Sequence, residues 1–407
     1  MEILVLNSGS SSLKFQLIET SPEQIQADAD RVRARGSVEK IGTGEAIISV
    51  EAGGAKTKFS REVLEHRDAV GIAASCLQDT GDGLKKEQIE GVGHRIVHGG
   101  EQFTQSVLID DEVVRHIQES IELAPLHNPH NLKGYFAARD MLPQARHAAV
   151  FDTSFHQTLP RHAFLYGLPH AVYDRHRVRR YGFHGTSHRY VSYRYARMFG
   201  KTRQEYKLIT CHLGNGCSVC AIDHGRSVDT SMGFTPLEGL LMGTRAGDID
   251  PAAVLHVMAK EELTIHEVSS LLNKHSGLYG LSGISNDMRT LVEQSEKGND
   301  RARMAIDVFC YRAKKYIGAY LATLNGADAV LFTGGIGENA PSVRAQICDR
   351  LDALGIVLDP AKNEAARGQA CRISGDDSAC QVWVIPTNEE LLIARDTLRC
   401  ILGLPPP

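Results

Sequence analysis

The first fifty residues alternate between short apolar runs and clusters of Gly, Ser and Asn, a pattern typical of strands joined by turns. Strands are predicted at residues 3–7, 12–18, about 33–41 and 45–51, with turns at Gly42 and Gly53–Gly54. Later elements are a helix at about 66–79, a strand in GVGHRIVHGG, helices at 110–123 and 131–141, and a buried strand at Ala148–Phe151. The N-terminal part is thus predicted to begin with strands and to continue with helices.

Beyond residue 150 the pattern mixes strands with helices. A turn and then a helix from about Thr186 or Ser187, either of which can cap it, are predicted for YGFHGTSHRYVSYRYARMFG. Two strands around a Gly/Asn loop are predicted for KLITCHLGNGCSVCAID. A buried strand, a glycine loop and a helix with Pro341 in its first turn are predicted for ADAVLFTGGIGENAPSVRAQICDRL. Long helices are expected at about 251–274 and 301–325, and a strand and a helix from about 388 close the sequence.

A weak internal repeat links the two parts. Residues 3–17 and 208–222 share a layout of apolar strand, glycine-containing loop and second alternating strand, with Gly9 and Gly216 in the loops. The identities are few, but the layout predicts a duplicated fold with one hairpin loop in each half, both directed at a common cleft.

Composition narrows the classes of protein. A chain of 407 residues favours two domains, and 23% charged with 42% hydrophobic residues is normal for a globular enzyme. A formal net charge of −4 provides no basic field for nucleic acid or an anionic membrane, so neither is expected as a partner. An anionic substrate must then be met by locally placed arginines and lysines.

Cysteine usage points to the cytoplasm. The nine cysteines are irregularly spaced and odd in number, which suits reduced thiols better than a disulfide framework. No apolar stretch approaches a membrane span, and the first strand begins at Ile3 without a basic segment before it, so no secretion signal is expected. Cys217 and Cys220 form a CxxC in an alternating strand pattern, where residues three apart face opposite sides; we interpret them as packed thiols.

The stretch NSGSSSLK places a Gly/Ser loop between two predicted strands, with Lys14 just beyond it. It is not a P-loop, which needs a GK[ST] ending that opens a helix. Backbone N–H groups in such a loop can form an anion nest, with Ser10, Ser12 and Lys14 as further donors. Alone the stretch is more typical of a structural hairpin; together with HLGNG and GGIGEN it predicts a phosphate site.

GGIGENA also matches a competing motif. Gly335, Gly337 and Ala340 follow a strand and open a helix, and Asp359 ends the next apparent strand, GIVLD, about twenty residues on, which is the order of a dinucleotide-binding fingerprint. Its position late in the chain, without continuing strand and helix alternation, argues against that interpretation. Both interpretations place a nucleotide against this loop.

Five short segments concentrate polar residues in loops with Gly or Pro: HRIVHGG, PLHNPHN, FDTSFH, FHGTSH and GTRAGDIDP. A single His beside a strand is usually structural, but several such segments together favour a site. Arg95 and Arg245 offer planar forks suited to a carboxylate and a phosphoryl group. A metal clip from His184 and His188 is the weaker option, because the glycine between them places His184 before the helix.

NSGSSSLKF, GHRIVHGG, FDTSFH, YGFHGTSH, HLGNG, TRAGDIDP, GGIGEN and PTNEE resemble, in order, the successive motifs of the acetate kinase family. They extend from residue 7 to residue 390 and so cover almost the whole chain. The resemblance implies the α/β fold of acetate and sugar kinases, Hsp70 and actin, with two ribonuclease H-like domains and an interdomain cleft. We expect residues 1–150 plus 388–407 to form the substrate and phosphate side, and 151–387 to bind nucleotide and dimerise.

The same resemblance implies a homodimer and the reversible reaction of ATP with acetate to give ADP and acetyl phosphate, with Mg²⁺ or, in its place, Mn²⁺. Asn7 and Glu389 are the implied metal ligands, and Asp152, His184 and Arg245 the implied catalytic residues. The implied substrate-binding residues are Lys14, Arg95, Val97, Leu126, His127, Phe183 and Pro236, with Val97, Leu126, Phe183 and Pro236 around the methyl group. The implied nucleotide-binding residues are His212, Leu213, Gly214, Asn215, Gly216, Asp287, Met288, Arg289, Gly335, Ile336, Gly337, Glu338 and Asn339.

We predict direct in-line transfer to acetate, because carboxyl groups with a reference pKa of about 4 are already ionised at pH 7. Asp152 is therefore predicted to orient Arg245 or a Mg²⁺-bound water rather than to act as a base. Val97 leaves less room than a smaller residue, which favours acetate over propionate.

Three alternatives stay open. The nearest is a propionate or butyrate kinase of the same architecture. The second is a non-enzymatic ATP-driven protein like actin or Hsp70. The arginine and histidine segments argue against it, because a protein that only changes conformation with ATP needs no site for a carboxylate substrate. The third is an NAD-dependent enzyme, which rests on GGIGENA alone.

Overall fold

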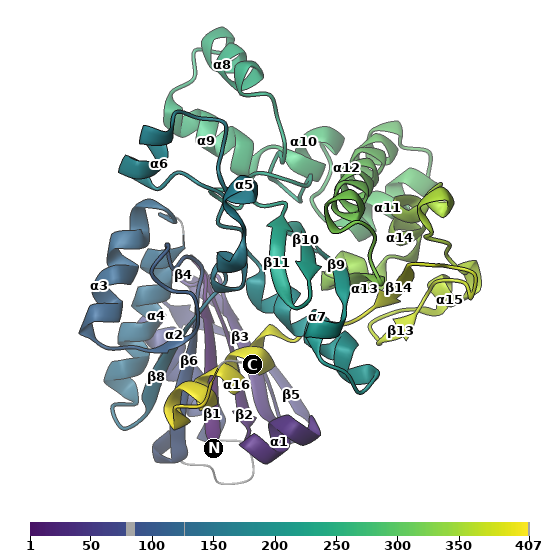
Figure 1. Cartoon of the computed structure of the whole chain (residues 1–407). Coiled ribbons are helices and arrows are strands. Elements are labelled where there is room, and N and C mark those ends of the chain that lie inside the picture. Colours follow the sequence, from purple (N-terminus) through teal and green to yellow (C-terminus); the bar gives the residue numbers. More distant parts are fainter. Residues whose placement is uncertain (79–85, 126, 406–407) are drawn as a thin grey trace. The chain divides into compact units, whose positions relative to one another are not determined.

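The computed structural model describes residues 1–78, 86–125 and 127–405 (Figure 1). The chain divides into two compact units, one made of Met1–Phe155 with Asn388–Pro407 and the other of His156–Thr387. The chain therefore leaves unit 1, forms unit 2, and returns to unit 1 at its C-terminal end. Among the described helices, none is both long and apolar enough to cross a membrane.

Unit 1 is built on an eight-stranded sheet in the order β5-β4-β3-β2-β1-β6-β8-β7. Its strands are β1 (Glu2–Ser8), β2 (Ser12–Glu19), β3 (Arg31–Glu39), β4 (Thr43–Ala52), β5 (Ala55–Val63), β6 (Ile89–Ile96), β7 (Val107–Leu108) and β8 (Arg146–Phe151). The strands from β5 to β1 pair antiparallel, whereas β1, β6 and β8 run parallel. The parallel strands end on one edge of the sheet, where the loops that follow them meet.

Five helices accompany this sheet: α1 (Pro22–Ala27), α2 (His66–Gln78), α3 (Asp111–Glu119), α4 (Asn128–Met141) and α16 (Glu389–Leu402). Short 3₁₀ turns lie at Lys86–Gln88, Ser120–Glu122 and Ser154–Thr158. The C-terminal helix α16, yellow in Figure 1, packs on β1, β6 and β8, and its Ile393 joins Ile3, Val5 and Val150 in a buried cluster. A Cβ at Gly93 would lie 2.4 Å from Thr397 Oγ1, so glycine in β6 lets this helix approach the sheet closely.

Unit 2 has a six-stranded sheet in the order β11-β10-β9-β12-β14-β13. Its strands are β9 (Lys207–Leu213), β10 (Cys217–Asp223), β11 (Arg226–Thr230), β12 (Ala329–Thr333), β13 (Cys371–Arg372) and β14 (Gln381–Val384). Its helices are α5 (Arg161–Phe164), α6 (His170–His176), α7 (Gly185–Met198), α8 (Pro251–Lys260), α9 (Ile265–Lys274), α10 (Gly277–Ser282), α11 (Met288–Glu296), α12 (Asp300–Leu324), α13 (Gly334–Asn339), α14 (Pro341–Cys348) and α15 (Pro360–Ala365), with 3₁₀ turns at Arg203–Glu205 and Asp352–Leu354. Both α7 and α12 pack against the sheet.

The two sheets repeat one topology. In unit 1, β3-β2-β1 are antiparallel and continue into parallel β6 and β8; in unit 2, β11-β10-β9 are antiparallel and continue into parallel β12 and β14. This strand order defines a ribonuclease H-like sheet, present twice. The predicted α/β fold class and the weak repeat of residues 3–17 and 208–222 are confirmed, since each repeat forms the first hairpin of its sheet.

Three predicted elements were wrong. The helix at 251–274 is two helices, because Glu262 has a left-handed φ of 53° and Thr264 with Glu267 forms a capping box that starts α9. GGIGEN is the short helix α13 rather than a loop. The segment GIVLD is no strand, and Asp359 instead caps α15 through its contacts with the amides of Ala361 and Lys362. The dinucleotide fingerprint therefore lacks its second strand.

Smaller differences between the predicted and the observed elements lie in polar parts of the sequence. The helix predicted from Thr186 or Ser187 begins at Gly185, with His184 at its N-cap. Four strands were missed: β5, whose side chains are almost all exposed and show no apolar face, and the short β7, β11 and β13. All four are held by antiparallel pairing with a neighbouring strand. Pairing of this kind is a tertiary effect that hydrophobic periodicity does not report.

Candidate functional site

The hairpin between β1 and β2 carries the first Gly/Ser loop. Asn7 and Lys14 are direct partners across the two strands, so their side chains lie on the same face of the sheet. The loop is closed by the Gly9 amide, which donates to Ser12 O at 2.8 Å, and Gly9 O lies 2.7 Å from His66 Nε2. Ser10 is exposed at the tip. The loop is thus held by backbone bonds and by His66, which sequence analysis had not selected.

Arg95 and Asp152 form the central ion pair of unit 1. Arg95 Nε donates to Asp152 Oδ1 at 3.0 Å and Arg95 Nη2 to Asp152 Oδ2 at 2.7 Å, a two-pronged geometry from the ends of β6 and β8. Glu389, in the first turn of α16, places Oε2 3.7 Å from the same Nη2. Burial lowers the pKa of Arg95, but the carboxylates of Asp152 and Glu389 outweigh it and raise that pKa above its ordinary value.

Glu390 adds a third carboxylate, which sequence analysis missed although it is the second Glu of PTNEE. Burial, and then the neighbouring Glu389, raise the pKa of Glu390 above its usual range. Lys14 and Glu390 also line one hollow of about 300 Å³. Two carboxylates therefore share Arg95, and a third lies beside them with Lys14 nearby.

This donor set fits a divalent cation. The carboxylates of Glu389 and Glu390 and the amide oxygen of Asn7 are hard oxygen ligands of the kind that Mg²⁺ prefers. The pKa of Glu390 is raised first by burial and then by the charge of Glu389, while Arg95 and Lys14 oppose the rise. A cation beside the two glutamates would reduce the repulsion between them.

Two asparagines of PLHNPHN fix the turn after β6. Asn128 Oδ1 accepts from the His98 amide at 3.1 Å and its Nδ2 donates to His98 O at 2.9 Å. Asn131 Oδ1 accepts from the Val97 amide at 3.0 Å, while its Nδ2 donates to Ser8 O at 2.8 Å. Asn131 thereby ties Val97 to the β1–β2 hairpin, and both asparagines are structural supports of the site.

In unit 2, the hairpin between β9 and β10 brings His184 and Arg245 together. A Cβ at Gly216 would lie 3.4 Å from His184 Nε2 and 3.6 Å from Arg245 Nη1, so the edge of the imidazole and the edge of the guanidinium both rest against this glycine. The loop is anchored by the Gly243 amide, which donates to Asn215 O at 2.9 Å. His184 has a left-handed φ of 56° at the N-cap of α7, a conformation unusual for a residue with a side chain.

Arg245 is a half-buried arginine without a carboxylate partner among the described residues. Its Nη1 donates to Pro236 O at 3.3 Å and lies 3.7 Å from Met242 Sδ, and no carboxylate of the described residues pairs with it. Burial lowers the pKa of Arg245, and the nearby Cys217 thiol is the only group that opposes this effect. An unneutralised guanidinium next to a Gly/Asn hairpin is suited to an incoming anion.

One pocket of unit 2 gathers three distant segments of the chain. It has a volume of about 680 Å³, within the range of small-molecule sites. Eight of the predicted nucleotide residues line it: Gly214, Asn215, Asp287, Met288, Arg289, Gly335, Ile336 and Asn339. Asn286, Ser342, Glu364 and Arg367 also line it and were not predicted. The structure thus unites residues that are separated by more than a hundred positions in the sequence.

Glu338 is turned toward the backbone rather than into this pocket. Its Oε1 accepts from the amides of Gly334 at 2.9 Å and Thr387 at 3.1 Å. His212, Leu213, Gly216 and Gly337 are likewise not among the lining residues. These five residues do not line the pocket, but they belong to β9, to the β9–β10 hairpin and to α13, and the hairpin and α13 carry lining residues.

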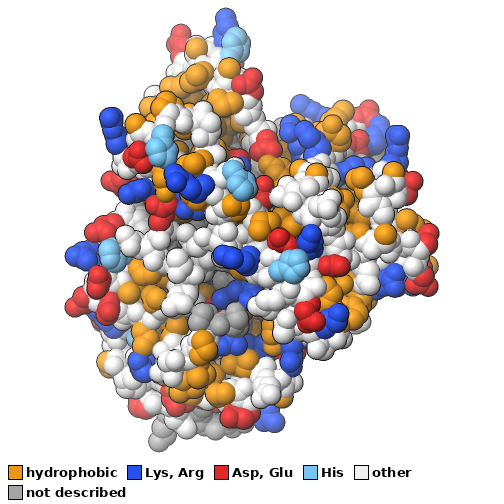
Figure 2. Space-filling model, viewed as in Figure 1, with side chains coloured by type: hydrophobic (Ala, Val, Ile, Leu, Met, Phe, Trp, Pro, Cys, Tyr) orange, Lys and Arg blue, Asp and Glu red, His pale blue; other side chains and the backbone are white. Residues whose placement is uncertain are grey.

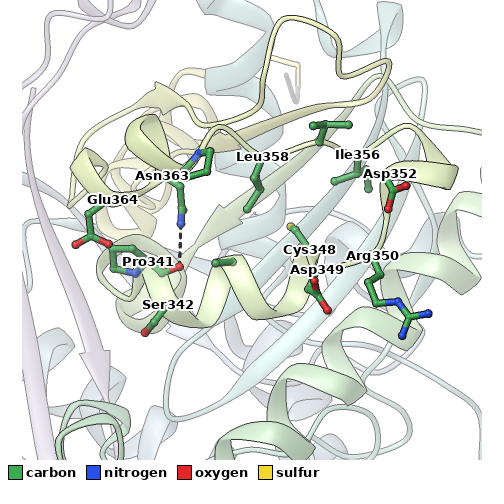
Figure 3. Close-up of a pocket in the computed structure, with 13 residues that line it drawn as sticks. Pro341, Ser342, Cys348, Asp349, Arg350, Asp352, Ile356, Leu358, Asn363 and Glu364 are labelled. Atoms are coloured by element: carbon green, nitrogen blue, oxygen red, sulfur yellow. Dashed lines mark hydrogen bonds between the residues drawn. The ribbon is translucent and has the colours of Figure 1, made fainter. Parts of the chain in front are cut away.

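Arg344 on α14 is completely buried and braces the same walls. Its Nη1 donates to Gly337 O at 2.9 Å, its Nη2 to Asn363 O and Ala366 O at 2.8 Å each, and its Nε to Asn363 Oδ1 at 2.9 Å. Asn363 Nδ2 in turn donates to Pro341 O at 2.9 Å, the dashed line in Figure 3. Burial lowers the pKa of Arg344 to about 10. This guanidinium cross-links α13, α14 and α15, and no pattern in the sequence had marked it.

The remaining predicted residues are distributed over both units. Val97 and His127 lie in unit 1, while Phe183 is buried and Pro236 half-buried in unit 2. Leu126 lies outside the described residues. Cys217 and Cys220 are buried free thiols on β10, and Cys217 Sγ donates to Gly214 O at 3.1 Å.

A duplicated ribonuclease H-like fold, a pocket bordered by the Gly/Asn hairpin, and a half-buried arginine against Gly216 of the same hairpin are the features of a nucleotide-dependent phosphotransferase. The sequence model of the acetokinase family matches residues 2–395. The chain belongs to the acetokinase family.

Two curated relatives match this chain over nearly its full length. An acetate kinase of Solibacter usitatus is 54% identical over 100% of both chains, and one of Halothermothrix orenii is 53% identical over 98% of this chain and 100% of its own. The crystal structure of Porphyromonas gingivalis acetate kinase matches with a TM-score of 0.91 and 45% identity, covering 98% of this chain and 99% of that one. A propionate kinase from Francisella tularensis matches with a TM-score of 0.90 and 39% identity, covering 99% and 100%.

Proposed function

We propose that this protein is an acetate kinase, which transfers a phosphoryl group reversibly from ATP to acetate and yields ADP and acetyl phosphate. The observation that carries the proposal is Arg245, a half-buried cation with no carboxylate partner among the described residues, whose Nη1 lies against Gly216 together with His184 Nε2. Full-length relatives named acetate kinase support the choice of substrate. The dinucleotide alternative is withdrawn, because Asp359 caps a helix instead of ending a strand.

In this proposal the nucleotide occupies the pocket lined by Asn215, Arg289 and Ile336, with its phosphates toward the β9–β10 hairpin. Arg245 and His184 stabilise the charge that develops on the transferring phosphoryl group, while Arg95 and Lys14 hold the acetate carboxylate. Acetate is already ionised at neutral pH and needs no base. Asp152, bonded at two points to Arg95, then acts as the residue that orients this guanidinium.

Mg²⁺, or Mn²⁺ in its place, is proposed at Asn7 and Glu389, with Glu390 as an additional candidate. Bound there, the ion neutralises negative charge on the nucleotide phosphates. The described cysteines are free thiols, which supports a cytoplasmic location for this reaction.

The decisive assay traps acetyl phosphate as its hydroxamate in a mixture of enzyme, ATP, Mg²⁺ and acetate. We expect acetyl hydroxamate only when all components are present, and a kcat/KM that falls from acetate to propionate to butyrate. A higher kcat/KM for a longer acid would identify the alternative, a propionate or butyrate kinase. ATP hydrolysis without any hydroxamate would overturn the proposal in favour of an ATP-driven conformational protein.

Val97 is predicted to restrict the chain length of the acid. It is half-buried, and its amide is fixed by Asn131 Oδ1 at 3.0 Å, so its side chain cannot easily move aside. Val97→Ala is expected to lower the KM for propionate about tenfold, the effect of roughly one methylene in an apolar pocket. The KM for acetate should change less. Val32→Ala, the same change on an exposed strand position, is the control, and an unchanged propionate KM in Val97→Ala would place the methyl pocket elsewhere.

A homodimer is proposed through the outer helices of unit 2. None of the residues of α8 is buried, although its sequence PAAVLHVMAK is mostly apolar, and hydrophobic side chains show on this segment in Figure 2. Leu255 is 66% exposed and Ile265, at the start of α9, is 80% exposed. A helix with so many apolar side chains in contact with solvent is typical of a protein–protein interface.

Leu255→Asp combined with Ile265→Asp is therefore expected to convert a dimer into a monomer, because two charges would have to be buried at the interface. Sedimentation or light scattering should give twice the chain mass for the wild type and one chain mass for the variant. Leu354→Asp, a change at a leucine 51% exposed on another element, is the control and should stay dimeric. A monomeric wild type would contradict this proposal but leave the kinase proposal intact.

A further inference from the structure

A line of hydrogen-bonded side chains lies behind His184. His184 Nδ1 is 2.9 Å from Ser218 Oγ, and the same Oγ is 2.7 Å from His188 Nε2. His188 Nδ1 lies 2.7 Å from Thr210 Oγ1. Ser218, His188 and Thr210 are fully buried. These four residues, here called the Thr210 relay, connect β9, α7 and β10 to the imidazole that shares Gly216 with Arg245.

The direction of the hydrogen bonds follows from the chemistry of His188. Burial, with the neighbouring His156 and His212, holds the pKa of His188 well below its ordinary value, so the ring is neutral and has one donor and one acceptor nitrogen. If Thr210 donates to Nδ1, then Nε2–H donates to Ser218, and the Ser218 hydroxyl proton is directed to His184 Nδ1. The opposite direction would place the proton of a neutral His184 on Nδ1.

Only the first direction gives His184 a proton on Nε2. A lone pair at Nε2 would repel phosphoryl oxygens, whereas an N–H would bind them. Nε2 is the atom that lies against Gly216, next to the guanidinium of Arg245. Successive hydrogen bonds that run in one direction also polarise one another, which strengthens the final donor.

We propose that Thr210, His188 and Ser218 are positioning residues that fix His184 as the neutral Nε2–H tautomer, ready to donate to the transferring phosphoryl group. This inference rests on the proposed function. It goes beyond it by assigning the tautomer, and by giving roles to three buried side chains that do not themselves touch the substrate. It also gives a reason for the burial of an α7 histidine, a β9 threonine and a β10 serine next to one another.

The titratable groups that face the relay are few. The His212 ring lies 4.2 Å from that of His184, and the His156 ring 5.8 Å from that of His188. The charged and titratable groups around the relay are His156, His212, Arg245 and Cys217. A proton added to His184 therefore meets Arg245 as a like charge, which favours the neutral ring in the free enzyme.

The test compares Ser218→Ala and Thr210→Val with the wild type between pH 6 and pH 9. Ser218→Ala removes the donor to His184, and we expect kcat at pH 8 to fall about 10- to 100-fold with little change in the KM values. Thr210→Val removes the donor to His188, which is two hydrogen bonds further from His184, and should give a smaller loss of kcat. Ser192→Ala deletes another buried hydroxyl of α7, one that donates only to its own helix at 2.9 Å, and serves as the control.

The pH dependence separates positioning from packing. An imidazolium carries protons on both nitrogens, so protonation supplies the Nε2–H that the variants lack. We therefore expect the defect of both variants to shrink as the pH falls toward 6, while Ser192→Ala follows the wild type at every pH. A defect of constant size across the pH range, or an unchanged kcat in Ser218→Ala, would overturn the proposal.

A second measurement does not depend on activity. Long-range ¹H–¹⁵N correlation spectra of the ¹⁵N-histidine-labelled full chain at pH 8 distinguish the two neutral tautomers, and the His184 signals are assigned by their loss in His184→Asn. We expect the Nε2–H tautomer in the wild type and a shift toward Nδ1–H in Ser218→Ala. An Nδ1–H wild type would refute the relay. A protein that forms no acetyl phosphate would refute the proposed function instead, and the spectra would still decide the tautomer.

Discussion

Arg245→Met is expected to abolish most of the turnover and at the same time to stabilise the protein. An arginine that neutralises a transferring phosphoryl group contributes about 10³- to 10⁵-fold to kcat, so a loss of that size is expected while the KM for ATP changes only a few-fold. Arg245 is half-buried, with a carbonyl and a thioether as neighbours and no carboxylate partner among the described residues. Removal of this unpaired, partly desolvated charge should raise the free energy of unfolding by about 1 kcal/mol.

The measurements are steady-state kinetics in the direction of acetyl phosphate synthesis and denaturant unfolding of the same samples. Arg245→Lys is the matched variant: it keeps the charge but loses the planar fork, so its kcat should lie between those of Arg245→Met and the wild type. Loss of activity together with clear destabilisation of Arg245→Met would mean that the guanidinium has an anionic partner in the folded protein, contrary to the geometry of unit 2.

The same substitution at Arg95 is expected to change stability in the opposite direction. Arg95→Met leaves the buried Asp152 carboxylate without the hydrogen bonds and charge of Arg95, which should cost about 3 kcal/mol of unfolding free energy. The kcat/KM for acetate should fall roughly 10²- to 10³-fold, because a carboxylate substrate loses its charged partner. Chemical denaturation and acetate titrations at saturating MgATP measure the two effects separately.

The double variant Arg95→Met with Asp152→Asn distinguishes the causes. Asparagine removes the charge that Arg95 neutralises in the wild type, so most of the lost stability should return, whereas the acetate kcat/KM should remain low because the guanidinium is still missing. If stability did not return, the loss in Arg95→Met would come from packing rather than from the isolated carboxylate.

Asp152→Asn alone tests the predicted absence of a general base. We expect a smaller loss of kcat than in Arg95→Met and no change in the basic or acidic limb of the pH profile, because Asp152 acts through Arg95. A loss of several orders of magnitude with unaltered Mg²⁺ dependence would instead favour direct participation of Asp152. Inversion at a chiral phosphorus is the matching stereochemical expectation, and retention would contradict a single direct transfer.

Much of the site could be predicted because short segments carry local chemistry. The Gly/Ser and Gly/Asn loops each lie between two strands of a hairpin, and alternation of apolar residues was sufficient to predict both hairpins. Eight predicted nucleotide residues line one pocket although they come from three separate segments. In contrast, α13 was predicted as a loop, because three glycines among six residues disfavour a helix that tertiary packing nevertheless imposes.

Other features depended on pairs of residues that only folding brings together. The sequence contains Arg95 and Arg245 as two similar arginines, and nothing local shows that one meets two carboxylates and the other none. Glu390 was overlooked beside Glu389, since its raised pKa comes from burial. Arg344 was overlooked for a similar reason: its partners are backbone carbonyls and Asn363, which become neighbours only when α13, α14 and α15 pack together.

By itself, then, the sequence determined the duplicated strand layout, the family and the residue types of the site, because hydrophobic periodicity and short polar motifs are local properties. The tertiary structure alone decided which charges are paired, which hydroxyl faces which imidazole nitrogen, and which apolar helix remains uncovered. Those properties depend on distances of a few ångströms between residues far apart in the chain, such as Ser218 and His184 at 2.9 Å. Hydrogen bonding and electrostatic neutralisation are decided at that scale.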